Sequence, residues 1–199
     1  MRAYDSVAVP DTGTLIQQAA LAEFREYGYE RATVRGIAER AGVRISTLYA
    51  HISSKEDLFL SIVAPVLERA DSDLAAIRAS GAPLREQLHR AIVTAASAFD
   101  AHGPELFIYL ADFFPALERA DPAARQAYEA RWVELLEAGR DAGLLRADLD
   151  AKMLAYGVLG MVNWMHQWYR PGGRLNATEI GEMFAAMVID GLTSPDGTR

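Results

Sequence analysis

The sequence predicts an all-α protein, and three observations support this fold class. Apolar residues recur at intervals of three or four, no segment alternates apolar and polar residues as strands do, and Gly or Pro residues separate the periodic segments. Apolar residues make up 51% of the 199 residues and charged residues 24%, which is enough apolar surface to build a core. We therefore expect helices throughout, divided into a three-helix domain over residues 13–60 and a larger helical domain over 61–192.

Three short helices are expected in the first domain. An amphipathic helix over 12–27 should end at Gly28, because glycine readily adopts the left-handed conformation that follows many helices. The second helix should begin after Thr33, a favourable N-cap residue, and end at Gly42. The third is expected over 44–50.

The larger domain is expected to begin with a long helix and to continue with five more. The hydroxyl of Ser54 can cap the long helix, and Pro65 should kink it, since proline lacks an N–H and clashes with the preceding turn. Breaks that contain Gly or Pro separate the remaining helices, which we expect over 83–101, 104–119, 121–142, 148–169 and 177–192.

The segment over residues 153–169 is unusual because it contains no charged residue. Its apolar side chains point in every direction around a helix, but it is short for a membrane span and polar residues interrupt it, so we expect it to be buried in protein. One side should face the chain's own core and the other a second subunit. Because the final helix carries a matching apolar stripe, we predict a C2 homodimer built on these two helices, with close approach at Gly157, Gly160 and Gly181.

Residues 33–55 show the spacing of a helix-turn-helix motif. The small Ala38 lets two helices approach, Gly42 allows the tight turn, and Leu48 anchors the second helix to the core. The outward side chains of that helix are short, polar or aromatic, which suits base edges and phosphates. The net charge of −7 argues weakly against nucleic acid, but residues 31–55 contain five basic side chains and one acidic side chain. We therefore expect double-stranded DNA as a partner.

Over about residues 14–60 the chain resembles the TetR family of transcriptional repressors. Three runs carry the resemblance: A-L-A-E-F-x-E-Y-G-Y at 20–29, T-V-x-x-I-A-x-x-A-G-V at 33–43, and T-L-Y-x-H-x-x-S-K-E-D-L at 47–58. Gly36, Arg44, Ile45 and Ile52 depart from the family's usual residues, which concerns the operator sequence more than the fold.

The resemblance also implies roles for individual residues in DNA binding. By their positions in the matching runs, Thr33, Tyr49 and Lys55 would hold phosphates. The side chains expected to approach base edges are Arg44, Ser46, Thr47 and His51.

The C-terminal half is similar to members of that family that control fatty-acid, steroid or related acyl catabolism and release DNA on binding acyl-CoA thioesters. The similarity lies in residues 128–139 and 160–173. Large aromatic side chains with few polar groups suit a lipophilic ligand. We expect an effector pocket that is bounded by members of one set, Phe107, Phe113, Tyr128, Trp132, Met161, Trp164 and Trp168, with Asn163, His89 or His102 as orienting polar groups. The acidic balance of the domain disfavours the phosphates of CoA, so a free fatty acid, a steroid or an aromatic compound stays open.

No group of residues predicts catalysis, a cofactor or a metal. The chain has no cysteine, and it lacks a phosphate loop, a dinucleotide fingerprint and a G-x-S-x-G elbow. Glu86 and His89 form a Glu-x-x-His pair, but helical di-iron sites use this pair twice and no second copy occurs. We therefore expect a protein that is not an enzyme.

The sequence is interpreted as that of a ligand-responsive regulator, most simply a repressor that binds a palindromic operator as a dimer. An effector would release it by favouring one arrangement of the helix that contains Pro65. Two alternatives stay open: a helical-bundle carrier or enzyme with a vestigial DNA-binding module, and a DNA-binding protein with a filled, ligandless core. Since no apolar signal segment follows Met1 and cysteine is absent, we expect a cytoplasmic protein without a membrane partner.

Overall fold

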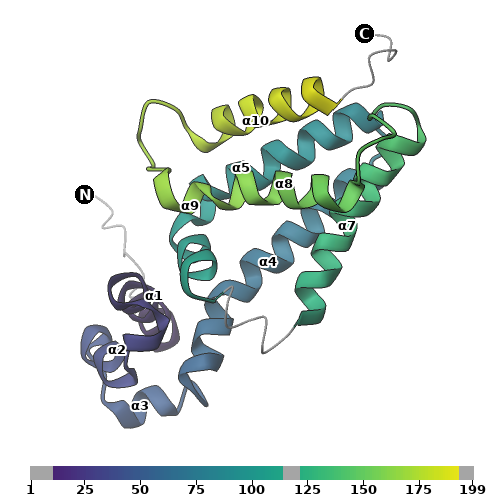
Figure 1. The fold of residues 1–199 in the computed structure, drawn as a ribbon. Coiled ribbons are helices and arrows are strands. Elements are labelled where there is room, and N and C mark those ends of the chain that lie inside the picture. The colour runs from purple at the N-terminus through teal and green to yellow at the C-terminus, as the bar shows by residue number, and fades with distance from the viewer. Residues whose placement is uncertain (1–10, 114–121, 193–199) are drawn as a thin grey trace, which may run out of the picture. The chain divides into compact units, whose positions relative to one another are not determined.

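The computed structural model describes residues 11–113 and 122–192, and every regular element in these ranges is helical. The predicted all-α class is thereby confirmed. In chain order the elements are α1 (Thr12–Arg31), α2 (Val34–Ala41), α3 (Ile45–Tyr49), α4 (Lys55–Ala79), α5 (Leu84–Ile108), the π-helix η1 (Tyr109–Phe113), α7 (Pro122–Asp141), α8 (Ala151–Asn163), α9 (Met165–Trp168) and α10 (Ala177–Leu192) (Figure 1). None of the helices described here is long and apolar enough to cross a membrane.

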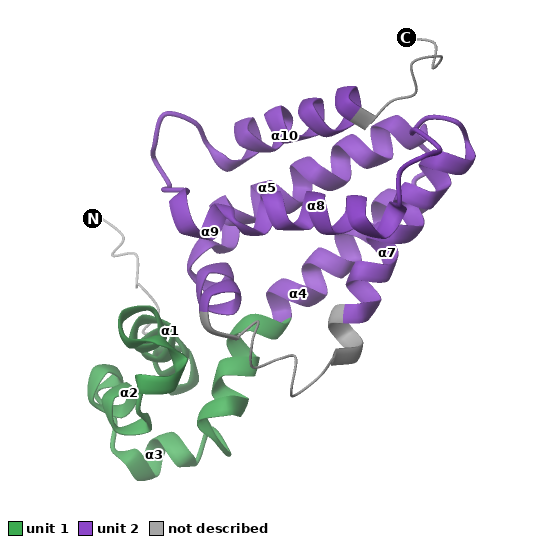
Figure 2. Ribbon diagram, in the orientation of Figure 1, with its two compact units in different colours: residues 1–64 green, residues 65–199 purple. Residues whose placement is uncertain are grey.

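The chain divides into two compact units, Met1–Ala64 and Pro65–Arg199 (Figure 2). The boundary falls inside α4, at Pro65, whereas the sequence places it near residue 60. We refer to the two parts as unit 1 and unit 2.

Unit 1 is built around an aromatic cluster that joins α1 to the start of α4. The rings of Phe24 and Phe59 are fully buried with centroids 5.2 Å apart, and the ring of Tyr29 lies 5.0 Å from that of Phe59. Offset and edge-on contacts of this kind are the favourable geometries of aromatic rings. Gly28 interrupts α1 where the sequence predicts the end of the first helix, since its φ of 76° is not helical, and a short helical segment then resumes as far as Arg31.

The helix-turn-helix of unit 1 has the local structure that its residues predict. The hydroxyl of Thr33 accepts a hydrogen bond of 3.0 Å from the backbone N–H of Gly36, which caps α2. Gly42 follows α2 with a φ of 69°, a left-handed conformation that is inexpensive for glycine, and Val43 N donates to Ala38 O at 3.0 Å. Leu48 is the one buried residue of α3 and fixes that helix to the core.

Unit 2 has its core between α5, α7, α8 and α10, with Trp132, Leu135, Leu136 and Ile92 among its fully buried side chains. Helix α10 packs directly on α5 (Figure 1). A Cβ atom added at Gly181 would lie 3.0 Å from Val93 Cα and 3.0 Å from Ala96 Cβ, so this glycine serves the contact between α10 and α5. Gly181 is predicted to serve a contact between subunits, and the structure shows that it serves a contact within one chain.

The predicted break at Gly103 and Pro104 appears as a bend inside α5. The chain bends at His102, whose φ of −135° and ψ of 28° are not helical. The helix then resumes and includes Gly103 and Pro104. This bend relieves the clash that a proline ring makes with the carbonyl four residues earlier. The described part of the expected helix over 104–119 is helical and consists of the end of α5 and of η1, while residues 114–119 lie outside those described.

The apolar segment after residue 150 forms two helices instead of one. Asp150 caps α8 by accepting a hydrogen bond of 2.9 Å from Met153 N, and the helix ends at Asn163. Trp164 separates α8 from the single turn of α9. Asp100 of α5 then fixes the start of α10, since its carboxylate accepts hydrogen bonds from the Tyr169 hydroxyl and, at 3.0 Å, from Ala177 N.

Candidate functional site

Helix α3 presents an exposed and largely polar surface. Arg44, Ile45, Ser46 and Tyr49 are exposed, and Thr47 is half-buried. Arg44 occupies the N-cap position without a side-chain capping bond. No acidic residue lies between positions 41 and 55, so this surface is electrostatically suited to a polyanion.

The basic side chains around α3 differ in the ion pairs and hydrogen bonds that they form. Arg35 pairs with Glu39 at 2.9 Å, and Arg40 pairs with Glu26 at 2.6 Å and with Glu23 at 3.3 Å. The hydrogen bond from Tyr27 and the charge of Arg40 lower the pKa of Glu26, which favours its ionised form. Of the five basic residues between positions 31 and 55, Arg44 is the one with no hydrogen-bond or ion-pair partner among the described residues.

Lys55 is used within unit 1 in a way that the sequence does not predict. Its Nζ donates to the carbonyl oxygens of Tyr29 at 2.8 Å and Ala32 at 3.1 Å, with a longer contact of 3.5 Å to Glu30 O. The same ammonium lies 4.4 Å from the centroid of the Tyr29 ring. Lys55 therefore satisfies the free carbonyls at the end of α1, where a cation is also favoured by the helix dipole. No sequence motif signals this contact, since the partners are main-chain atoms more than twenty residues away.

A buried carboxylate lies behind α2. Among the described residues Glu23 is the one charged residue that is buried, and it is paired with Arg40. A Cβ atom at Gly36 would lie 2.2 Å from Glu23 Oε1, so the carboxylate occupies the space that any other residue at position 36 would need. This packing explains why glycine stands where the family resemblance leads one to expect an acid. A second acid at this place would also repel Glu23.

Two of the predicted ligand residues lie together in the core of unit 2. Trp132 is fully buried, and the ring of Tyr128 lies 6.5 Å from it in an edge-on arrangement. Burial raises the pKa of the Tyr128 phenol, so the neutral form is favoured. Trp132 Nε1 and Gln87 Oε1 are buried, and neither makes a hydrogen bond of good geometry to another described residue. The side chain of Trp132 does contact the Tyr128 hydroxyl, and this contact lowers the pKa of Tyr128 less than burial raises it. Buried polar atoms without a well-aligned partner are uncommon in protein interiors.

The other predicted ligand residues do not join this pair. Trp164 is 62% exposed and Trp168 is 46% exposed, because both lie on the outside of unit 2, and Phe107 is exposed with its ring 6.2 Å from His166. Met161, Asn163 and His102 are half-buried, with His102 at the bend of α5. The side chain of Phe113 lies outside those described. The predicted aromatic residues therefore fall into two groups. Tyr128 and Trp132 lie in the core of unit 2, and Phe107, Trp164 and Trp168 are exposed on its surface.

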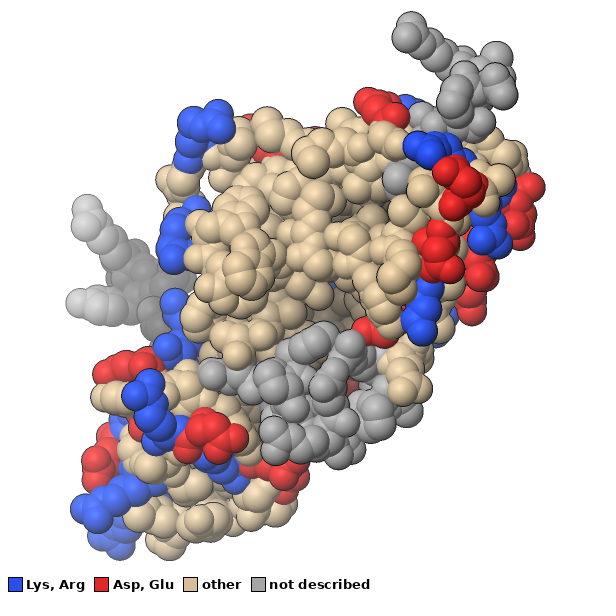
Figure 3. Space-filling view, in the orientation of Figure 1, with Lys and Arg blue, Asp and Glu red and all other residues tan. Residues whose placement is uncertain are grey.

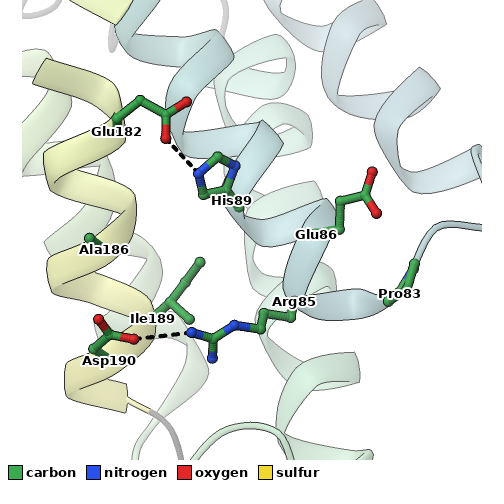
Figure 4. Close-up of a pocket in the computed structure, with 8 residues that line it drawn as sticks. All are labelled: Pro83, Arg85, Glu86, His89, Glu182, Ala186, Ile189 and Asp190. Atoms are coloured by element: carbon green, nitrogen blue, oxygen red, sulfur yellow. Dashed lines mark hydrogen bonds and ion pairs between the residues drawn. The ribbon is translucent and has the colours of Figure 1, made fainter. Parts of the chain in front are cut away.

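His89 lines an open groove of about 450 Å³ between α5 and α10 (Figure 4). Its Nε2 lies 2.8 Å from Glu182 Oε2, and Arg85 bridges the same helices through a 3.0 Å bond to Asp190. The side chains of His89 and Arg85 both point toward α10 in this view. The mixture of acidic and basic groups here indicates pairing between helices, and among the described residues no three potential ligand side chains form a metal site.

The outer face of α8, α9 and α10 is strongly apolar. We call it the apolar face, and its members are the large exposed side chains Met153, Tyr156, Trp164, Trp168, Met183 and Met187. Helices α8 and α10 contact one another, and the surface over them shows almost only uncharged atoms, while charged atoms gather toward α7 (Figure 3). Contiguous apolar surface of this kind usually marks an interaction site.

These features define a class of protein: an all-α, DNA-binding transcription regulator of the helix-turn-helix type. The chain belongs to the TetR family. Residues 16–62 match the model described as bacterial regulatory proteins of the tetR family, and residues 81–192 match the tetracyclin repressor-like C-terminal domain.

Individual relatives agree with this assignment. The chain is 34% identical over 177 residues to the HTH-type transcriptional repressor KstR2 of Rhodococcus jostii RHA1, with 86% of each chain covered. It is 31% identical over 196 residues to KstR2 of Mycobacterium tuberculosis H37Rv, with 91% and 92% covered. A solved structure of the ketosteroid transcriptional regulator KstR2 of Mycobacterium tuberculosis superposes with a TM-score of 0.80 at 28% identity, over 94% of this chain and 97% of that one. The protein is accordingly a transcription regulator and not an enzyme, as the sequence predicts.

Proposed function

We propose that the protein is a ligand-responsive repressor that binds a palindromic operator as a homodimer through α3. The observation that carries this proposal is the free polar surface of α3, with the unpaired Arg44 at its start. In this proposal Thr33 and Tyr49 contact phosphates, while Arg44, Ser46, Thr47 and His51 approach base edges. Lys55 reaches a phosphate only if its ammonium leaves the carbonyls of α1.

The apolar face supports the homodimer. A lone chain would expose six large apolar side chains on three neighbouring helices, whereas a second copy would cover the same face of both chains. Two helices from each subunit would form a four-helix interface. The open space around Gly157 and Gly160 would admit a partner helix at close range.

An electrophoretic mobility assay with promoter DNA from the chain's own locus tests the DNA-binding part. The wild-type protein should shift a duplex that contains a palindrome, and Arg44→Ala should weaken binding and relax the base preference. Arg174→Ala, which removes an exposed arginine from unit 2, is the matched control and should bind as wild type does. An equal loss of affinity in both variants would contradict the assignment of α3.

For the effector we propose a lipophilic small molecule, with steroid-type compounds first among the candidates. Two relatives are named KstR2 and a solved one is described as a ketosteroid regulator, while their names give no specific support to fatty acyl-CoA. The site would lie near Trp132 and Tyr128, where an oxygen atom on the ligand would give the N–H of Trp132 the well-aligned hydrogen bond that no described residue supplies. This is the arrangement of most small-molecule sites, in which apolar walls surround a few fixed polar groups.

Release of a labelled operator distinguishes the effector classes. The titrated compounds should be a ketosteroid acid, its CoA thioester, a fatty acid and a fatty acyl-CoA. Stronger release by either steroid compound supports the proposal, and stronger release by the fatty compounds contradicts it. Trp132→Phe should weaken the response to the oxygen-bearing steroid without changing operator affinity in its absence.

A further inference from the structure

The first residue of α3 is an exposed isoleucine. Ile45 is 44% exposed, and Tyr49, one helical turn later on the same face, is 54% exposed. Single exposed apolar residues are common and need no explanation. These two side chains, however, lie side by side on the helix that a helix-turn-helix protein inserts into the major groove of DNA. Their contact partner in the complex is therefore a part of the duplex.

The charge around Ile45 matches such a partner. Arg44 precedes it and has no partner among the described residues, and Ser46 follows it in an exposed position. Acidic residues are absent from positions 41–55. An apolar protein partner would gain nothing from this unpaired cation, whereas phosphates on either side of the groove would.

Base chemistry then limits what Ile45 can contact. The edges of base pairs in the major groove consist mainly of hydrogen-bond donors and acceptors, and the one methyl group among them is the C5-methyl group of thymine. An isoleucine placed against any other edge would leave its donor or acceptor without water and without a partner, which is unfavourable. Against thymine, the aliphatic side chain and the methyl group remove each other's apolar surface from water.

Resting on the proposed DNA binding, we propose that Ile45 is a specificity-determining residue that selects thymine in each half-site through its C5-methyl group. Arg44 and Ser46 supply the polar contacts beside it. The neighbouring Tyr49 limits the space around the methyl group, because it lies on the same face of the helix.

The test uses the full-length protein and duplexes selected from a random-sequence library. Each thymine of the preferred duplex is then replaced by uracil, which keeps the base pair with adenine and removes the methyl group. One thymine per half-site should be sensitive, with affinity falling about fourfold per methyl, the factor that corresponds to burial of one such group. Ile45→Ala should bind the thymine and uracil duplexes equally, and Ile45→Val should retain most of the discrimination.

Tyr27→Ala is the control, since it removes an exposed apolar side chain of unit 1 that lies on α1 instead of α3. It should discriminate thymine from uracil as wild type does. The inference is overturned if no thymine is sensitive, or if Ile45→Ala keeps the same thymine-to-uracil ratio while still binding DNA. Failure to select any duplex would overturn the proposed function as well, so the two failures are distinguishable. An unchanged circular dichroism melt shows that Ile45→Ala is folded.

Discussion

Lys55 shows how one side chain can stabilise two helices at once. Its ammonium satisfies carbonyl oxygens at the end of α1, while its own residue begins α4. Hydrogen bonds that involve a charged group are worth more than neutral ones, because the charge strengthens the electrostatic attraction. A phosphate contact, which the family resemblance implies for Lys55, would have to compete with these carbonyls.

Lys55→Ala should therefore lower stability more than it changes DNA binding. We expect the free energy of unfolding in urea to fall by about 1–2 kcal/mol, since charged hydrogen bonds contribute at this level. The slope of operator affinity against salt concentration should stay the same. Lys152→Ala, which removes an exposed lysine beside Tyr156, should leave stability nearly unchanged. A fall of about one in the salt slope, without loss of stability, would show that Lys55 contacts a phosphate instead.

Tyr128 should make the free energy of unfolding depend on pH in the alkaline range. Burial raises the pKa of its phenol above the ordinary value of 10.0, so the folded protein holds this proton more tightly than the unfolded chain does. The corresponding stability is fully present below pH 10.0 and is lost as the pH rises through the folded pKa. In Tyr128→Phe this loss is absent, and urea unfolding at pH 9 and pH 11 should differ less than in wild type. An equal difference in the two proteins would contradict the prediction.

At the residue scale, the sequence predicts contacts that are local in the chain. The Thr33 cap, the left-handed Gly42 and the buried Leu48 each follow from neighbours within a few positions, and the structure confirms them. The Lys55 contacts and the buried Glu23 beside Gly36 depend on segments brought together by folding. Residue type and spacing carry no information about such pairs.

At the element scale, the sequence identifies helices more reliably than their ends. Gly28 and Pro104 are both expected to end or separate helices, and in each case the chain departs from helical geometry at one residue, Gly28 or His102, before a helical segment resumes. Packing on both sides of the bend stabilises the continued helix, and local helix propensity does not include this packing energy. The division of 148–169 into α8 and α9 has the same origin, since Met165 and Tyr169 are buried in a separate cluster.

The contact between α10 and α5 depends on the absence of a side chain at position 181. A Cβ atom there would lie 3.0 Å from backbone of Val93, which cannot move like a flexible side chain. Gly181→Ala should therefore lower the free energy of unfolding by about 1–3 kcal/mol, the usual cost of overpacking. Urea denaturation followed by circular dichroism measures this change.

Gly191→Ala is the matched control on the same helix. Position 191 has nothing within 4 Å, so an alanine there meets open space and improves helix propensity. We expect unchanged or slightly higher stability for this variant. Equal destabilisation by both substitutions would mean that close packing on α5 is not the reason for Gly181.

At the scale of the whole molecule, the sequence predicts a helical protein in two parts, and the family assignment agrees with its N-terminal motif. The effector residues are the weakest part of the prediction. A buried and an exposed tryptophan can stand at the same helical spacing, so the sequence does not distinguish Trp132, which is buried, from Trp164, which is exposed. The uncharged segment after residue 152 predicts a helix with cover on both sides, and the structure shows one side of α8 buried in the core of unit 2, while cover of the other side stays a prediction.

The proposed homodimer makes operator binding depend on the apolar face. Met187 is 65% exposed in the single chain, and a dimer of the proposed kind would bury it. Met187→Glu would then place an unpaired carboxylate in an apolar interface, at a cost that shifts the equilibrium toward monomers. Sedimentation at micromolar concentration should show a dimer for wild type and a monomer for the variant. Because a monomer reaches only one half-site, the affinity of Met187→Glu for the full palindrome should fall to that for a half-site duplex.

Gln126→Glu adds the same charge at an exposed position of α7 and should remain dimeric with full operator affinity. A wild-type protein that sediments as a stable monomer, or a Met187→Glu variant that stays dimeric on the full operator, would contradict the assignment of this face to the dimer.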